Sequence, residues 1–348
     1  MGSFLLRRSG VMLLTALCLT FVVFFLTNLE PNLEKLTKSE GNMRMTDVQV
    51  QSWLEKNGYR QPLIKRYGEW LGVAPGWTRT DDDGKQTGRC VKPGTDAAEA
   101  PRFCGLLQGE WGQSLVFKEP IGGIVLEKLG HTGWLMFWVL VVMVPTALVI
   151  GVVAGMREGT KTDRALSTFS VLTTSTPEYV SGIIFIVIFA SKLGGLRWFK
   201  GTAATAMDQI TFENFTLPVV TLALYGVGYI ARMTRASMAE VMTEQYIRTA
   251  RLKGMSFKAV VLKHALRNAL IAPFTVIMLQ IPWLLTGVVI VETLFNYKGF
   301  GWTLVAAVGN NDIELLLACS VVAVMVVLVT QLISDIGYVF LNPRIRVN

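Results

Sequence analysis

The sequence is poor in charge and in the residues that most enzymes use for chemistry. Of its 348 residues only 17% are charged, and it contains two histidines and four cysteines. Hydrophobic residues make up 51%, and the mean hydropathy is +0.45. Such a composition excludes a disordered chain and a purely soluble enzyme, and it indicates a protein that crosses a membrane several times.

Motifs for catalysis and for nucleotide binding are missing too. The sequence has no G-x-x-x-x-G-K-[ST] phosphate loop, so the chain cannot by itself hold ATP in the usual way. Neither His131 nor His264 stands in a motif with nucleophile or metal-ligand spacing, and no intramembrane protease motif occurs. A membrane-embedded hydrolase is therefore disfavoured, and any energy from ATP must come from a partner.

The first apolar run, Val11–Leu29, follows Arg7 and Arg8. It is long enough to span, because a bilayer core of ~30 Å needs about 20 helical residues. The stretch Thr27–Glu30 offers no signal-peptide cleavage site. We expect residues 1–30 to form an uncleaved transmembrane helix with a cytoplasmic N-terminus. A twin-arginine export signal is the alternative, but the residues around the arginine pair fit it poorly.

The rest of the chain predicts a polar segment followed by a five-helix core. Residues 31–132 form the polar segment, which we place in the periplasm, and residues 133–348 form the five-helix core. The expected spans are 133–155, 166–190, 216–235, 270–294 and 315–340. The predicted fold class is an all-α polytopic membrane protein with six transmembrane helices and both ends in the cytoplasm.

The positive-inside rule tests this topology, because short cytoplasmic loops are richer in Lys and Arg than short outer loops. The long segment 31–132 escapes the rule, since long translocated domains do. The basic residues expected on the cytoplasmic side are Arg157, Lys161, Arg164, Arg232, Arg235, Arg248, Arg251, Lys253, Lys258, Lys263, Arg267, Arg344 and Arg346, against Lys192, Arg197, Lys200 and Lys298 in the short outer loops. The net charge of +8 is therefore mostly a topology signal.

The four cysteines fall into two classes. Cys18 and Cys319 lie inside apolar spans, whereas Cys90 and Cys104 lie in the polar segment. In an oxidising periplasm a bridge between the second pair would stabilise an irregular loop by about 3 kcal/mol on the chain-entropy model. Two free thiols are the alternative. A metal site is disfavoured, because no histidine or third cysteine lies nearby.

The stretch between the fourth and fifth helices, residues 236–269, is unusually long for a connection in a helical membrane protein. Met242–Gly254 predicts a short helix ended by glycine, and Ser256 can cap a second one. Along that second helix Phe257, Val260, Val261 and Ala265 recur on one face. The periodicity of these apolar residues alone fits two structures equally well: a docking surface for a partner protein and an interfacial helix that lies on lipid.

The run Tyr246–Gly254 (YIRTARLKG), followed by Lys263–Leu270 (KHALRNAL), resembles the signature loop of binding-protein-dependent ABC transporter permeases. More narrowly it is similar to the dipeptide/oligopeptide (Dpp/Opp B-type) class, with Arg248-Thr249-Ala250 in the place of that family's Glu-Ala-Ala. The resemblance extends to segments 59–67, 109–115, 291–301, 334–338 and 342–346. Departures are Asn342 where Asp is usual, the stretch 310–313, and residues 81–103, which look like an insertion.

This resemblance implies an inner-membrane permease subunit of an ABC importer that moves a peptide or peptide-like solute into the cytoplasm. It implies a second permease subunit, two ATPase subunits that bind ATP and Mg, and a periplasmic solute-binding protein; no cofactor is expected on this chain. The residues that it assigns to contact with the ATPase are Tyr246, Arg248, Thr249, Ala250, Lys253 and Gly254. Similar permeases serve nickel, glutathione, opines or oligosaccharides, so the substrate stays open.

Ionisable residues inside spans usually face a cavity or a partner, because burying them in lipid costs several kcal/mol. Glu178 follows Pro177 within the third span, so this pair is a candidate for a kinked, solvated part of the pathway. A carboxylate hydrogen-bonded between helices is the alternative. For Glu292 and Asp335, which lie near the ends of their spans, we favour that structural role.

Two prolines, Pro273 and Pro282, should bend the fifth span. In Dpp-type relatives this helix lines the pathway, so Pro282 and the adjacent Trp283 are candidate constriction residues. A packed or lipid-facing tryptophan is the commoner case. An ion channel or ion-driven transporter is the competing function; it should show inverted repeats or broken helices with ion ligands. The sequence has no internal repeat.

Overall fold

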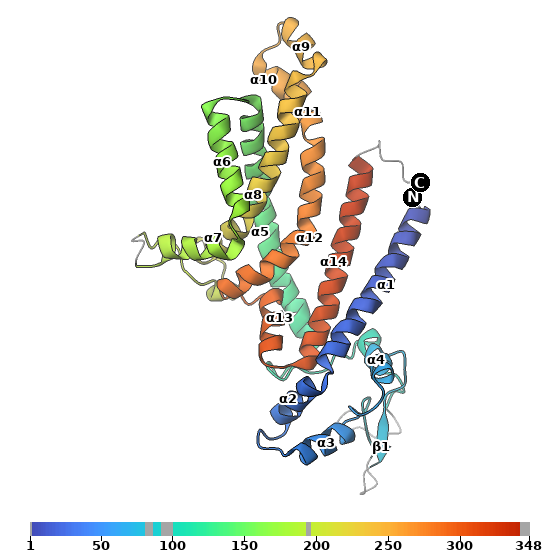
Figure 1. The fold of residues 1–348 in the computed structure, drawn as a ribbon. Helices are drawn as coiled ribbons and strands as arrows, with labels where there is room; N and C mark the ends of the chain where they lie inside the picture. The colour runs from blue at the N-terminus through green and yellow to red at the C-terminus, as the bar shows by residue number, and fades with distance from the viewer. Residues whose placement is uncertain (1, 81–85, 92–99, 193–195, 342–348) are drawn as a thin grey trace. The chain divides into compact units, whose positions relative to one another are not determined.

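The computed structural model describes residues 2–80, 86–91, 100–192 and 196–341 (Figure 1). The motif 342–346 and much of the proposed insertion 81–103 lie outside the described residues. The chain divides into two compact units. We call residues 1–8, 128–302 and 326–348 the large unit, and residues 9–127 and 303–325 the small unit.

Within the described ranges, five helices are long and apolar enough to cross a membrane, and a bent pair adds a sixth if it forms one span. The five are α1 (Gly2–Thr27), α5 (Ile121–Met156), α8 (Phe212–Thr243), α12 (Ile271–Leu294) and α14 (Ile313–Leu341). A shorter apolar helix, α13 (Phe300–Gly309), was not predicted. The predicted all-α membrane fold is confirmed.

The third predicted span is not a single helix. Where the sequence predicts one helix over 166–190, the structure has α6 (Lys161–Ser175) and α7 (Glu178–Phe185), which with its π-helical continuation η2 (Ile186–Ala190) bends away by 105° (Figure 1). Thr176 is extended, with φ −99° and ψ 119°. Proline disfavours the α conformation in the residue before it, so Pro177 explains the break.

The second span begins earlier than predicted, at Ile121 rather than at residue 133. Ile121, Ile124 and Val125 are buried. The charged residues that follow them, Glu127 and Lys128, make this first part of the helix look polar in sequence, and the prediction stopped there.

The core of the large unit lies between α5, α8 and α12. It contains Met143, Leu222, Ile230 and Leu284, none of which is exposed to solvent. A Cβ at Gly226 on α8 would come within 2.1 Å of the Met143 sulfur, so the Met143 side chain would have to move. Small residues let helices approach closely where no water drives their association.

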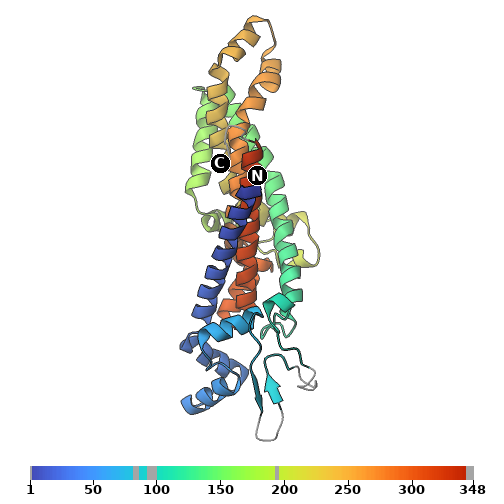
Figure 2. The same cartoon turned by 90° about the vertical axis from the view of Figure 1, so that its right-hand side faces the viewer.

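The small unit has short elements of its own. They are α2 (Glu30–Glu40), α3 (Asp47–Lys56), α4 (Leu63–Leu71), the strands β1 (Thr78–Thr80) and β2 (Gln86–Gly88), and the single turn η1 (Leu106–Gln108). The strands form an antiparallel hairpin (Figure 2). A cluster of buried apolar residues holds the helices: Phe24, Leu33, Leu36, Val50, Leu54, Trp70, Ile313 and Leu317.

Two further ties close the small unit. Cys90 and Cys104, for which the sequence left a bridge or two free thiols open, form a disulfide. Asp312, buried before α14, accepts hydrogen bonds from Ser114 Oγ at 2.6 Å and from the Val116 amide at 3.2 Å. Its other oxygen accepts from the Leu315 amide at the start of α14. The stretch 310–313 that departs from the family pattern therefore retains a carboxylate cap.

Candidate functional site

The connection between α8 and α12 folds into a compact turn, which we call the docking loop (residues 244–270). Glu244 leaves the helical conformation, α9 (Gln245–Leu252) follows, and Gly254 reverses the chain. Then come α10 (Phe257–Val260), the π-helical stretch η4 (Val261–Ala265) and α11 (Leu266–Ala269). Figure 1 shows α9 and α10 beyond the end of α8. The predicted helix over 242–254 thus begins at residue 245, because α8 runs on to Thr243.

The inner face of the docking loop is apolar and buried. Ile247 and Ala250 from α9, and Val260, Val261 and Ala265 from the returning chain, pack on Met238 of α8. Ser237 Oγ adds a hydrogen bond of 2.8 Å to the Ala269 carbonyl oxygen. Packing on both sides of the turn makes the loop an extension of α8 rather than a free connection.

The outer face carries most of the residues predicted to contact an ATPase. Tyr246, Arg248, Thr249, Lys253 and Gly254 are exposed, and the Tyr246 hydroxyl accepts a hydrogen bond of 2.9 Å from Asn268. Ala250 differs: it is 6% exposed and faces inward, so it packs the loop instead of presenting itself to a partner.

At Gly254 the backbone φ is +75°, and a Cβ added there would meet nothing within 4 Å. The requirement for glycine therefore comes from the left-handed backbone and not from crowding.

Two exposed apolar residues at the tip were missed by the sequence analysis. Leu252 is 79% exposed, and Phe257 is 53% exposed under the guanidinium of Arg251, which lies 5.9 Å from the ring centroid. The prediction placed Phe257 on the same face as Val260 and Ala265, and this was wrong. Phe257 is the first residue of α10, beside the turn, and it lies outside the buried cluster that contains Val260, Val261 and Ala265.

An ion pair joins α6 to α8 before the docking loop begins. Arg235 donates to both oxygens of Asp163, from Nε at 2.5 Å and from Nη2 at 2.7 Å. Asp163 is 3% exposed and also accepts from Ser167 Oγ and from the Gly159 amide. The sequence signal was Thr160 three residues before Asp163, a capping pattern, and Thr160 does cap α6.

The candidate pathway residues come together beside the break between α6 and α7. Pro177 precedes α7, and Glu178 is its first residue. On α12, a Cβ placed at Gly287 would lie 3.6 Å from Glu178 Oε1 and 3.8 Å from Trp283 Cη2. Trp283, next to Pro282, stacks on Tyr225 of α8 with ring centroids 4.4 Å apart. Three helices therefore bring a carboxylate and two aromatic rings to one place.

Glu292 and Asp335 have structural partners. Glu292 is fully buried and accepts hydrogen bonds from the Thr132 hydroxyl and from the Trp302 amide. It thereby joins the end of α12 to the start of α13. Asp335 pairs with Arg8 at 2.5 Å and accepts from Gln331. Both contacts agree with the structural role favoured from sequence.

Comparison with known proteins decides the class of this arrangement. Residues 147–347 match the model of the binding-protein-dependent transport system inner membrane component family. The chain belongs to this family. It is 35% identical, over 69% of its length and 77% of the relative, to the "Probable peptide ABC transporter permease protein y4tP" of Sinorhizobium fredii. It is 27% identical, over 99% of its length and all of the relative, to the oligopeptide transport system permease protein AppB of Bacillus subtilis.

A third relative is the glutathione transport system permease protein GsiC of Escherichia coli K12, 33% identical over 69% of this chain and 76% of GsiC. The family is the permease component of ABC importers, which work with solute-binding and ATPase partners. A broken helix such as α6–α7 would also suit an ion-driven transporter. Family membership decides against that alternative.

Proposed function

We propose that this chain is one of two permease subunits, in a heterodimer, of an ATP-driven importer for a peptide or peptide-like solute. Two ATPase subunits that bind ATP and Mg would dock on the cytoplasmic side, and a solute-binding protein would deliver substrate at the outer face. Both chain ends would lie in the cytoplasm and the disulfide-bonded segment in the periplasm. The names of y4tP, AppB and GsiC support this substrate class, since all three point to peptides or a peptide-like compound.

The observation that carries the coupling part of the proposal is the form of the docking loop. It has a buried apolar face that fixes it to α8, and a tip that exposes Arg248, Leu252 and Lys253. A tip that mixes exposed apolar and basic side chains on a stiff support suits insertion into a protein groove.

The same geometry suggests how movement of the loop would reach the pathway. The helix α8 is continuous from the docking loop to Arg235, and Arg235 is hydrogen-bonded to Asp163 on α6. Helix α6 ends at the break that precedes Glu178. A pull on α9 would thus be carried by two stiff helices and one bidentate ion pair to the Glu178–Trp283 cluster, which we propose lines the pathway.

The test of this function is uptake by the full complex. The tagged chain is purified gently from its native membrane, co-purifying subunits are identified by mass spectrometry, and the complex is reconstituted in liposomes. We expect a second permease and ATPase subunits, and uptake of a labelled tripeptide that requires both ATP and the binding protein. Uptake driven by an ion gradient without ATP would overturn the proposal, and uptake of labelled glutathione alone would narrow the substrate.

The pathway assignment of Glu178 has its own experiment. The change Glu178→Gln keeps the size of the side chain and removes its charge. If Glu178 lines the pathway, uptake changes while the subunits still co-purify in normal amounts. Loss of the assembled complex would show instead that the carboxylate holds helices together. Glu158→Gln, on the exposed turn before α6, is the control and should leave both readouts unchanged.

A further inference from the structure

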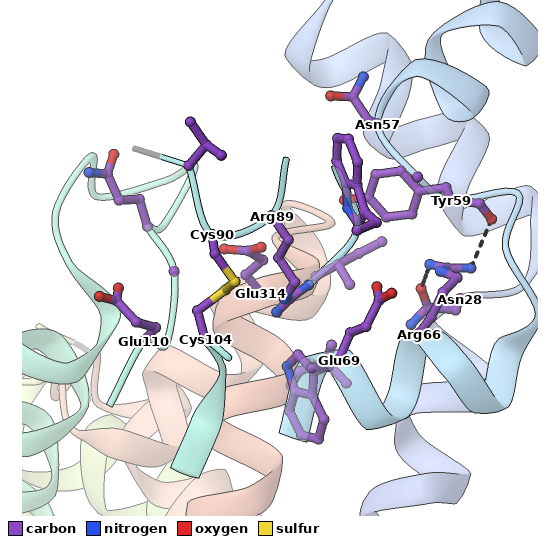
Figure 3. A pocket seen from close by; sticks show the side chains of 18 of the residues that line it. Asn28, Asn57, Tyr59, Arg66, Glu69, Arg89, Cys90, Cys104, Glu110 and Glu314 are labelled. Atoms are coloured by element: carbon purple, nitrogen blue, oxygen red, sulfur yellow. Dashed lines mark hydrogen bonds between the residues drawn. A yellow bond between two sulfur atoms is a disulfide. The ribbon is translucent and has the colours of Figure 1, made fainter. Parts of the chain in front are cut away.

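The small unit contains a cavity of about 830 Å³ that plays no part in the proposed coupling. Its walls come from α3, α4, the segment around the Cys90–Cys104 disulfide and the first turns of α14 (Figure 3). This volume falls within the range of sites for small organic molecules and is far larger than a site for a bare ion. Within the described residues, no group of three or more His, Cys, Asp or Glu side chains could hold a metal.

The charges on the cavity wall are mostly negative. Four carboxylates line it against two guanidinium groups. The carboxylates are Glu40, Glu69, Glu110 and Glu314, and the guanidinium groups are Arg66 and Arg89. Arg66 is partly committed already, because it donates to Asn28 Oδ1 and to the Tyr59 carbonyl oxygen. The wall therefore favours a cation over an anion.

Glu69 is the residue that marks a binding site. It is only 1% exposed, yet its Oε1 has no hydrogen-bond partner. Lys65 Nζ lies 3.9 Å from that oxygen, beyond hydrogen-bond distance. Burial raises the pKa of the Glu69 carboxyl, and Lys65, Arg89 and Arg66 only partly oppose this. A buried acceptor without a donor is costly, so it is normally satisfied by a protein group, by water or by a ligand.

A second carboxylate is held in place on the opposite wall. Glu314 accepts a hydrogen bond from the Gln113 amide, and Gly112 lies so close that a Cβ there would overlap its carboxylate. Gly112 has a φ of +83°, which a residue with a side chain rarely adopts. Figure 3 shows Glu69, Glu314 and Arg89 pointing into the same space.

Four aromatic rings form another part of the wall. Trp53, Tyr59, Trp70 and Trp77 line the cavity. Indole and phenol faces attract cations, and the Arg66 guanidinium already lies 4.9 Å from the centroid of the Tyr59 ring. An acceptor that lacks a donor calls for an N–H group, so a quaternary ammonium would leave Glu69 unsatisfied.

From these features we infer that the cavity of the small unit binds a small organic molecule through its primary ammonium group, which donates to Glu69 and is attracted by Glu314 and the indole rings. This site goes beyond the proposed function, because it concerns binding to the small unit and not passage through the large one. The Cys90–Cys104 bridge joins two segments that line the cavity.

The experiment is calorimetric titration of the full chain, purified in detergent, with matched probes. Triglycine amide carries an ammonium group and no carboxylate, N-acetyltriglycine amide carries neither, and N-acetyltriglycine carries only the carboxylate. We expect triglycine amide to bind at least about tenfold more tightly than either acetylated probe, since a hydrogen bond to a charged group contributes about 1.5–3 kcal/mol. Glu69→Gln should remove this preference, and Glu119→Gln, on an exposed carboxylate outside the cavity, should not.

Three results would overturn the inference. The first is equal binding of triglycine amide and N-acetyltriglycine amide. The second is a preference for N-acetyltriglycine, which would mean that Arg89 binds a carboxylate. The third is no binding of triglycine amide at millimolar concentration. The comparison of probes on the unchanged chain does not depend on any variant. If Glu69→Gln does not fold, Glu314→Gln gives a second test of the same preference. Because the titration involves no transport, its failure would leave the uptake experiment standing.

Discussion

The docking loop and the disulfide-bonded part of the small unit solve the same problem in different ways. Each is a long excursion from the helices, and each must hold a defined shape. The docking loop does so with a buried apolar face, one glycine turn and a side-chain cap on α10. The small unit adds a covalent bridge between Cys90 and Cys104 around irregular chain. Periodic sequence can be folded by packing, whereas sequence without periodicity needs a cross-link to limit its unfolded ensemble.

The strongest test of this comparison is Gly254→Val in the docking loop. With φ at +75°, a β-branched residue costs at least about 1–2 kcal/mol in this conformation, so the turn should change shape. We expect ATP-dependent uptake to fall at least about tenfold. Correct positioning commonly increases a rate by more than about tenfold, and the variant would lose this increase. ATP hydrolysis by the complex and uptake are measured side by side to separate uncoupling from failed assembly.

Gly254→Asn is the matched control, because Asn adopts the left-handed conformation more readily than other residues with side chains. A Cβ at this position meets nothing within 4 Å, so crowding cannot explain a difference between the two variants. Equal loss of uptake in both would mean that the turn needs glycine for contact with the partner. Normal uptake in the valine variant would contradict the coupling role of the loop.

Much of this loop could be predicted from sequence, because its signals are local. Gly254 marked the turn and Ser256 the cap, and both hold in the structure. The exposure of Phe257 could not be predicted from spacing, because spacing does not show that the buried contact with Met238 begins only at Val260, one turn into the helix. The inward position of Ala250 could not be predicted for another reason. A family resemblance identifies the residues of a motif, but it does not show which side of a helix each residue occupies.

The small unit should respond to the loss of its cross-link instead. Changing Cys90 and Cys104 together to Ser should lower the free energy of unfolding of this unit by about 3 kcal/mol. Its tryptophans, among them Trp53 and Trp70, report this through fluorescence during thermal unfolding, and the same shift should follow reduction of the unchanged protein. Cys18→Ala removes a free cysteine and is the control. An unchanged transition in the double variant would mean that packing alone folds this unit, and the contrast would fail.

The fold of the small unit was largely beyond prediction from sequence. Its core combines Phe24, Leu54 and Trp70 with Ile313 and Leu317, which lie more than two hundred residues further along the chain. No local period joins such residues. The cavity with Glu69 and Glu314 has the same origin, because its two carboxylates come from distant segments. The residues of the Glu178–Trp283 cluster were easier to select from the sequence, because a proline or a carboxylate inside a predicted span is rare and each can be recognised without its neighbours.

A non-covalent counterpart of the disulfide is the Asp163–Arg235 pair that supports the docking loop. Asp163→Asn removes the charge that Arg235 contacts at 2.5 and 2.7 Å, and we expect a loss of stability of about 2 kcal/mol, because hydrogen bonds to charged groups contribute about 1.5–3 kcal/mol. Thermal unfolding of the complex measures it. Glu158→Gln removes only the contact of 3.9 Å to the same arginine and should cost less than about 1 kcal/mol. Equal losses of stability in Asp163→Asn and Glu158→Gln would mean that the net charge near Arg235 matters and the bidentate hydrogen bonding does not.

The smallest expected effect separates packing from capping within the loop itself. Ser256 caps α10 by accepting a hydrogen bond from the Ala259 amide, but at 3.4 Å this bond is long, and α10 has only four residues. Ser256→Ala should therefore cost about 0.5 kcal/mol, the low end for a lost cap, and leave uptake unchanged, because Val260, Val261 and Ala265 still fix the chain on Met238. Ser256→Asp keeps an acceptor at the cap and should restore the lost stability. If Ser256→Ala abolished uptake and Ser256→Asp restored it, the cap and not the buried face would set the orientation of the tip. The docking loop would then depend on one local bond, as the small unit depends on its disulfide.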